Sequence, residues 1–185
     1  MIVMHVVGIF GYIGSGKDTV AAFFEKRGYK NYSYGDLLRA ASLSAGRTVE
    51  RHDLQLTRQE HDAKYCKEHF PNIIVEKIVA DKCEKAIISG IRNPEDAIVP
   101  KKHFGKDMIL IFVDADAEVR YTRLKKRGRE GDPTAFSAFS RQESRERRIF
   151  DFKTTEKLCD VAVKNNSSLN RLEKNIEKIM EKIKD

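Results

Sequence analysis

Short apolar runs alternate with longer amphipathic stretches along this chain. The longest runs, at residues 2–10 and 107–115, are mainly apolar, as expected for strands covered on both faces of a sheet. Shorter runs predict further strands at 29–34, 85–90 and 159–166, and the intervening periodicity predicts helices at 18–28, 36–46, 117–128 and 167–185. This alternation predicts an α/β fold: a five-stranded parallel sheet flanked by helices on both faces.

Several residues mark where the predicted helices begin and end. Gly28 is expected to stop the first helix, and Asp36 is expected to cap the start of the second. Residues 47–85 are polar and helix-like, with one expected break near Pro71. The final helix carries an apolar stripe that is expected to dock on the core, formed by Leu169, Leu172, Ile176, Ile179 and Ile183.

The whole chain, residues 1–185, is expected to form a single domain, because it has no repeat, linker or low-complexity segment. No apolar run approaches the roughly 20 residues that cross a bilayer. The first strand runs straight into a glycine-rich loop and has no basic segment before it, unlike a signal segment. The scattered cysteines Cys66, Cys83 and Cys159 predict neither a disulfide framework nor a zinc site, and suit a cytoplasmic protein without a membrane partner.

The net charge of +7 has two interpretations. It can reflect a lysine-rich solvated surface, or it can serve an anionic partner. Residues 120–148 hold ten Arg or Lys residues against four Asp or Glu residues, so part of the positive charge is concentrated in one segment. About half of these cations are expected to be solvated helix surface.

A glycine-rich loop follows the first predicted strand. Residues 11–19 read GYIGSGKDT, which satisfies the pattern G-x-x-x-x-G-K between a buried strand and an amphipathic helix. In such a phosphate-binding loop, or P-loop, backbone N–H groups surround phosphate oxygens, and glycine leaves room for their approach. Lys17 is expected to lie across the β- and γ-phosphates of ATP. The candidate ATP-binding residues are Gly11, Tyr12, Ile13, Gly14, Ser15, Gly16, Lys17, Asp18 and Thr19.

Asp18 follows the loop lysine, where a serine or threonine is usual. A carboxylate beside a triphosphate is repelled unless a cation lies between them. One interpretation is that Asp18 faces a Mg²⁺ ion, directly or through water, while Thr19 contacts the α-phosphate. The other is that Asp18 only favours the first helical turn through the helix macrodipole. The sequence leaves both open.

The segment SYGDLLRAA, residues 33–41, resembles the acceptor-binding segment of adenylate kinases and other nucleoside monophosphate kinases. The resemblance implies that Arg39 holds the acceptor phosphate and that Asp36 caps the helix or approaches the Mg²⁺ region. Residues 89–97, SGIRNPEDA, are similar to the D-G-F-P-R segment of these kinases, which places Arg92 between the two nucleotides. Residues 36–85 would then form a helical acceptor-binding insertion.

The segment RLKKR resembles the arginine pair at the lid hinge of the same kinases, and it matches Arg123 and Arg127. Arg141, Arg145 and Arg148 fall where that family closes its lid. The resemblance therefore implies a P-loop NTPase fold with a short helical lid at 128–148, here without zinc cysteines, and catalytic roles for Lys17, Arg92, Arg123, Arg127, Arg141 and Arg145. Arginine suits phosphoryl transfer because its planar fork binds phosphate through two nitrogens.

The loop and the ending CDVAVKNNSSLNRL also resemble dephospho-coenzyme A kinases and archaeal nucleotide-kinase-like proteins. One departure concerns Ser89, which stands where these kinases have a Mg²⁺-organising aspartate. The expected function is ATP- and Mg²⁺-dependent phosphoryl transfer to a small nucleotide, most simply a nucleoside or deoxynucleoside monophosphate. Dephospho-coenzyme A kinase, a regulatory or nucleic-acid-directed P-loop ATPase, and a nucleotide-binding protein without turnover are the alternatives. Nucleic acid is the less expected partner, because basic and aromatic residues are not interleaved.

Overall fold

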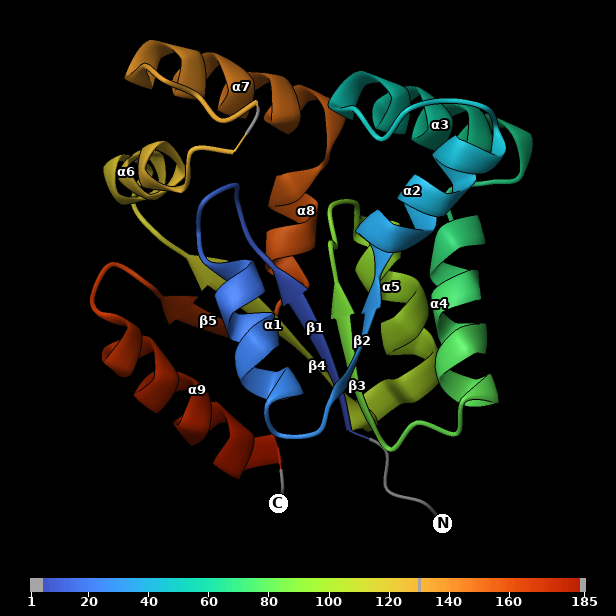
Figure 1. Cartoon of the computed structure of the whole chain (residues 1–185). Coiled ribbons are helices and arrows are strands. Elements are labelled where there is room, and N and C mark those ends of the chain that lie inside the picture. Colours follow the sequence, from blue (N-terminus) through green and yellow to red (C-terminus); the bar gives the residue numbers. More distant parts are fainter. Residues whose placement is uncertain (1–4, 130, 184–185) are drawn as a thin grey trace.

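A computed structural model describes residues 5–129 and 131–183 of the chain. Its sheet has the strand order β2-β3-β1-β4-β5, and every pairing is parallel. The strands are β1 (His5–Phe10), β2 (Lys30–Ser33), β3 (Lys85–Ser89), β4 (Met108–Asp114) and β5 (Val161–Lys164). The five-stranded parallel α/β fold expected from the sequence is confirmed within these described residues (Figure 1).

The central strand β1 is apolar because both of its faces are covered. β1 lies between β3 and β4, with Val7 opposite Ile87 on one side and Ile109 on the other. One face of the sheet packs against α4 (His69–Ala80), α5 (Pro94–Phe104) and α8 (Phe152–Lys157). The other face packs against α1 (Lys17–Glu25) and α9 (Leu169–Ile183). The apolar stripe of α9 docks on this second core through Leu172, Ile176 and Ile179.

Four helices gather beyond the carboxyl ends of the strands. They are α2 (Tyr34–Ser44), α3 (Arg51–Lys64), α6 (Ala117–Arg127) and α7 (Phe136–Ile149). In Figure 1, α6 and α7 stand on one side of the molecule and α2 and α3 on the other, and α7 and α3 lie above the loop that follows β1. Because ligands of open parallel sheets bind at these carboxyl ends, the four helices frame the place where a ligand is expected.

Local signals in the sequence placed some boundaries wrongly. Ser33, and not Asp36, caps α2: its backbone is extended, and its hydroxyl accepts a hydrogen bond from the Asp36 N–H. The break in residues 47–85 falls at 65–68, while Pro71 lies in the first turn of α4, where its missing N–H costs no helical bond. The segment expected to form a short helical lid, 128–148, contains the regular helix α7.

A few expectations lie outside the described residues. They are the start of the first strand at residues 2–4, Glu130 of the expected lid, and the docking of the Ile183 side chain. Within the described part of the chain, every helix is too short or too polar to span a lipid bilayer.

Candidate functional site

The glycine loop between β1 and α1 is shaped by close backbone approaches. Gly14 and Gly16 have φ angles of 76° and 98°, which side chains disfavour. A Cβ atom on Gly11 would lie 2.4 Å from the Val113 carbonyl oxygen, and one on Gly16 would lie 2.4 Å from the Asn165 side-chain nitrogen. Glycine therefore lets the loop pack closely against the end of β4 and the Asn165 side chain at the start of α1, where phosphate-binding loops lie.

Lys17, the first residue of α1, turns back over this loop. Its Nζ donates a hydrogen bond to the Tyr12 carbonyl oxygen at 2.9 Å. Burial and then the nearby Arg92 lower the pKa of Lys17 to about 8, although Asp18 and Glu146 act in the opposite direction. An incoming polyphosphate would place negative charge beside the Lys17 ammonium and would favour its charged form.

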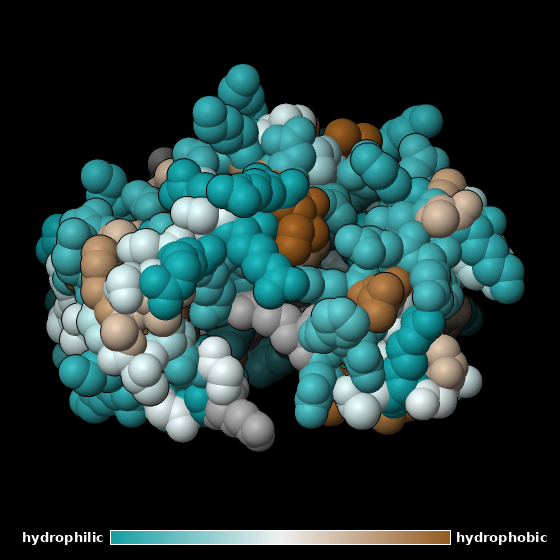
Figure 2. Space-filling model, turned by 90° about the horizontal axis from the view of Figure 1, so that it is seen from above, coloured by the Kyte–Doolittle hydropathy of each residue, from teal (hydrophilic) through white to brown (hydrophobic). Residues whose placement is uncertain are grey.

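A cleft of about 870 Å³ extends from this loop between α1 and α2. Seen from above, the molecule is hollowed between its two sides, and the surrounding surface is mainly hydrophilic (Figure 2). The cleft brings together most of the residues singled out in the sequence: Gly11, Ile13, Gly14, Gly16, Lys17, Asp18, Thr19, Asp36, Arg39, Arg92, Arg123 and Arg127. This volume lies within the range of ligand sites, about 300–1,000 Å³.

Two loop residues lie outside this lining. Tyr12 packs its ring against Phe10, Phe112 and Phe152, and its hydroxyl donates to Glu156 at 3.2 Å. Ser15 is fully buried beneath the loop. Both side chains are therefore turned away from the cleft, and the Ser15 N–H already bonds to the Tyr12 carbonyl oxygen at 3.2 Å.

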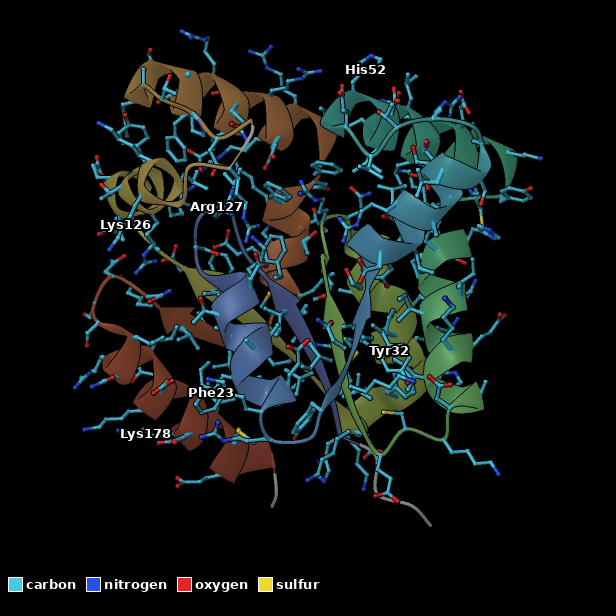
Figure 3. All side chains as sticks on the ribbon, viewed as in Figure 1. Phe23, Tyr32, His52, Lys126, Arg127 and Lys178 are labelled. Atoms are coloured by element: carbon cyan, nitrogen blue, oxygen red, sulfur yellow. The ribbon has the colours of Figure 1, made fainter. Side chains whose placement is uncertain are left out.

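Two cleft arginines are paired with carboxylates close to them in the sequence. Arg39 pairs with Asp36 one turn away on α2, and Arg127 pairs through two nitrogens with Asp132. Figure 3 shows that Arg127 points toward the middle of the molecule, whereas its neighbour Lys126 points outward. Because phosphate offers the same kind of charged oxygen, a bound nucleotide could replace these carboxylates.

Arg92 lies on the loop between β3 and α5. Its guanidinium is 3.6 Å from the buried carboxylate of Glu146 on α7 and lies 5.0 Å from the centre of the Phe150 ring. Since α7 supplies Glu146 and leads directly to Phe150, Arg92 joins the cleft to the expected lid.

Arg123 reaches the glycine loop from α6. It lies 3.5 Å from the Ser15 carbonyl oxygen and 3.3 Å from the side-chain oxygen of Asn165. Burial lowers the pKa of its guanidinium. Arg123 is thus already held against the loop, on the side of the cleft formed by α6 and β5.

The α7 arginines expected in the cleft lie elsewhere. Arg141 and Arg145 line a separate hollow of about 300 Å³ together with Gln55, and Arg145 is 3.5 Å from the Gln55 oxygen. Arg148 is exposed. The face of α7 that turns inward carries Phe139, Glu143 and Glu146 instead.

Sequence reasoning missed several residues of the site. Arg129 lines the cleft beside Arg127. Asn165 donates to the Ser15 carbonyl oxygen at 2.8 Å, and Glu146 pairs with Arg92. The position of Arg129, two residues after the lid-hinge segment, was a usable signal. The other contacts join residues far apart in the sequence and had no local signal.

Arg120 was counted among the basic residues near the lid, but it is a buried structural residue. Its Nη2 atom lies 2.6 Å from Glu143, and its Nε donates to the Ala115 carbonyl oxygen at 2.8 Å. Its guanidinium also lies over the rings of Tyr12 and Phe139. Arg120 therefore fastens α7 to α6 and the glycine loop.

The cleft has a polar floor near β2 and α2, formed by Glu25, Asn31, Ser33 and Ser89. Ser89, at the carboxyl end of β3, donates to the Asn31 oxygen at 2.8 Å, and the Asn31 nitrogen donates to Glu25 at 2.9 Å. The strand end that commonly carries an aspartate in the resembling kinases thus presents a neutral hydroxyl.

The donor set of the cleft fits a Mg²⁺ ion that is held mainly by phosphate and water. Asp18 and Thr19 are exposed in the first turn of α1 and line the cleft. The described residues contain no group of three or more His, Cys, Asp or Glu side chains that could hold a metal. Mg²⁺ in phosphate-transferring sites uses one or two carboxylates together with substrate oxygens. Among the cleft carboxylates Asp18, Glu25, Asp36 and Glu146, Asp18 directly follows the loop lysine and is the candidate for such a contact.

Comparisons with known proteins agree with this geometry. A family model described as an AAA domain matches residues 7–151. The UPF0200 protein PAE1629 of Pyrobaculum aerophilum is 34% identical over 178 residues, which cover 96% of this chain and 97% of that protein. Identity at this level over nearly the whole of both chains shows a common family.

Solved structures share the architecture at low identity. TT1252 from Thermus thermophilus has a TM-score of 0.60 and 20% identity over 97% of both chains. Shikimate kinase from Acinetobacter baumannii, in complex with shikimate, has a TM-score of 0.60 and 10% identity over 98% of this chain and 96% of that one. These likenesses show the fold, which is a P-loop kinase-like fold. The family model and the 34% identity to PAE1629 together show that the chain belongs to the UPF0200 family and carries an AAA domain.

Proposed function

We propose that this protein is a phosphotransferase that moves the terminal phosphoryl group of Mg-ATP to a small nucleotide, most simply a nucleoside or deoxynucleoside monophosphate. The observation that carries this proposal is the single cleft shared by Lys17 of the glycine loop and by Arg39 and Arg92 of the acceptor side. A protein that only hydrolysed ATP would need no second cationic group at the far end of its cleft.

The positions of the cleft residues suggest separate roles for them in binding ATP and the acceptor. The glycine loop and Lys17 bind the β- and γ-phosphates of ATP, and Arg39 binds the acceptor phosphate. Arg92, Arg123 and Arg127 surround the space between them. There they stabilise the charge that spreads over the transferred phosphoryl group and orient the two substrates. When bound, Mg²⁺ neutralises charge on the donor phosphates.

The reaction requires no protein base when the acceptor is a phosphate. An acceptor oxygen that is already ionised forms the new O–P bond as the bond between the γ-phosphorus and the β–γ bridging oxygen breaks. The products are ADP and the acceptor diphosphate. A hydroxyl acceptor such as dephospho-coenzyme A would need a carboxylate base. At the Arg39 end of the cleft, Asp36 is engaged by Arg39, and Glu25 accepts a hydrogen bond from Asn31.

A coupled assay of ADP release tests the proposal, with a panel of nucleoside monophosphates, deoxynucleoside monophosphates and dephospho-coenzyme A. We expect ADP release only with a monophosphate. Arg39→Ala and Arg92→Ala should each lower kcat/KM about 100-fold or more. Lys126→Ala is the matched control, since Lys126 points away from the cleft. Acceptor-independent ADP release, or full rates in both arginine variants, would contradict the proposal.

A further inference from the structure

Asp96 is a buried carboxylate that the proposed chemistry does not use. Its exposure is 0%, and it is the third residue of α5. Its Oδ2 atom accepts hydrogen bonds from the backbone N–H groups of Arg92 and Asn93, both at 3.0 Å. Its Oδ1 atom lies 3.0 Å from Nη2 of Arg58 on α3. The bond to Asn93 caps α5, but a helix cap requires neither complete burial nor an arginine partner.

Arg58 is held in one orientation. Its side chain is 12% exposed, and its Nε lies 2.9 Å and 3.0 Å from the two carboxylate oxygens of Asp62 on the same helix. The guanidinium therefore spans Asp62 and Asp96. On α2, the Tyr34 hydroxyl donates to the Asp96 carbonyl oxygen at 2.8 Å. Both acceptor-side helices, α2 and α3, thus converge on Asp96.

Arg92 lies on the opposite side of Asp96 from α2 and α3. Asp96 holds its backbone N–H, and the buried Thr155 hydroxyl of α8 lies 3.4 Å from its carbonyl oxygen. Its side chain meets Glu146 of α7. Arg92 therefore lies between the acceptor-side helices and the expected lid. A shift of α3 would be transmitted to the Arg92 backbone through the Arg58–Asp96 ion pair.

We propose that Asp96, held by Arg58, is a positioning residue that sets Arg92 in the cleft according to the position of α3. This inference rests on the proposed function for its kinetic consequence. An acceptor that closes α2 and α3 would thereby place the Arg92 guanidinium at the transferred phosphoryl group. Arginine is required because a lysine at position 58 would offer one ammonium in place of a fork that binds Asp62 and Asp96 together.

The kinetic test uses Arg58→Lys and the matched control Arg47→Lys. Arg47 also pairs with α3, through Glu60 and Thr57, but neither of these contacts involves Asp96. We expect Arg58→Lys to lower kcat about tenfold with the KM for ATP unchanged, because small displacements of a catalytic group are costly. Arg47→Lys should stay within about twofold of wild type. In an Arg92→Lys background, Arg58→Lys should have no further effect on kcat. Equal losses in both backgrounds, or equal losses in the two lysine variants, would overturn the proposal.

A second readout does not depend on turnover. Hydrogen exchange at the Arg92 and Asn93 amides should be faster in Arg58→Lys than in wild type, whereas exchange in β1 and in the Arg47→Lys variant should be unchanged. If wild type turns over none of the acceptors, the proposed function fails. Hydrogen exchange at the two amides still tests whether Arg58 and Asp96 position Arg92. Unchanged exchange at both amides would overturn it.

Discussion

Asn165, just beyond β5, donates its side-chain N–H to the backbone carbonyl oxygen of Ser15 at 2.8 Å, inside the glycine loop. Its Oδ1 atom lies 3.3 Å from Nη2 of Arg123. One amide thus joins the end of an outer strand, the loop and a cleft arginine. Because its backbone N–H also bonds to the Asp114 carbonyl oxygen, Asn165 is fixed independently of the loop that it supports.

This bond predicts that Asn165→Asp weakens ATP binding. The carboxylate would face the Ser15 carbonyl oxygen without a proton to donate, and it would bring negative charge close to the phosphate site. We expect the Kd for ATP to rise about tenfold or more. Asn166→Asp is the control, because Asn166 acts as an acceptor for the Asp116 N–H and aspartate can keep that bond. Equal Kd values for the two variants would show that Asn165 does not support the loop electrostatically.

Lys17 predicts a pH dependence of nucleotide binding. Its pKa is lowered to about 8 by burial and by Arg92, so the ammonium loses its proton as the pH rises through that value. ATP favours the charged form. The Kd measured by calorimetry should therefore be constant below pH 7 and should increase above pH 8. A Lys17→Arg variant, whose charge persists, should not show this increase. A flat profile in wild type would mean that Lys17 remains charged without ligand.

The same shift predicts that Lys17 lowers stability. Its pKa in the folded protein lies below the unfolded value of about 10.4, so between these values the unfolded chain binds more protons and stability increases with pH. Below pH 8, Lys17 is charged in the folded protein, and the free-energy cost of burying its ammonium is fully present. Lys17→Met should then raise the free energy of unfolding at pH 7 by up to about 3 kcal/mol, while it abolishes ATP binding. Urea denaturation of wild type and Lys17→Met at pH 7 and at pH 10 measures this difference in the free energy of unfolding. The difference should be smaller at pH 10.

The features that the sequence predicted well are those with local signals. The buried runs of β1 and β4 and the spacing of Gly11, Gly16 and Lys17 each lie within one segment, so the sheet and the phosphate loop could be predicted. The cap of α2 could not be resolved from composition, because Ser33 and Asp36 both favour helix starts and only the extended backbone at Ser33 decides between them.

The cleft was harder to predict, since its contacts join distant residues. Arg58 and Asp96 are 38 positions apart, and nothing in either segment indicates that they pair. The sequence also did not predict which face of α7 turns toward the cleft. This helix buries Phe139 and Glu146, so a pattern of apolar residues alone does not show that its glutamates face inward and that Arg141 and Arg145 face away from the cleft.

Asp18 gives a prediction that separates its two interpretations. If it faces Mg²⁺, Asp18→Asn should raise the Mg²⁺ concentration needed for half-maximal turnover about tenfold. If it acts only on the helix macrodipole, this concentration should be unchanged, and stability should fall by about 0.3–1 kcal/mol. Glu118→Gln is the control, because Glu118 occupies the first turn of α6 and is absent from the cleft lining.

The polar floor of the cleft predicts a residue that affects the acceptor alone. Asn31 is oriented by Ser89 and Glu25 at the end of the cleft away from Arg123 and Arg127, so its loss should disturb the acceptor and leave the ATP site intact. Asn31→Leu should raise the KM for the acceptor about tenfold, because it leaves the Ser89 hydroxyl and any acceptor polar group unpaired. The KM for ATP should stay within about twofold of wild type. Lys30→Leu is a suitable control on the same strand, since Lys30 pairs with Asp81 outside the cleft. If Asn31→Leu raised the KM for ATP as much as that for the acceptor, the floor would belong to the donor site, and the assignment of the two ends of the cleft would have to be reversed.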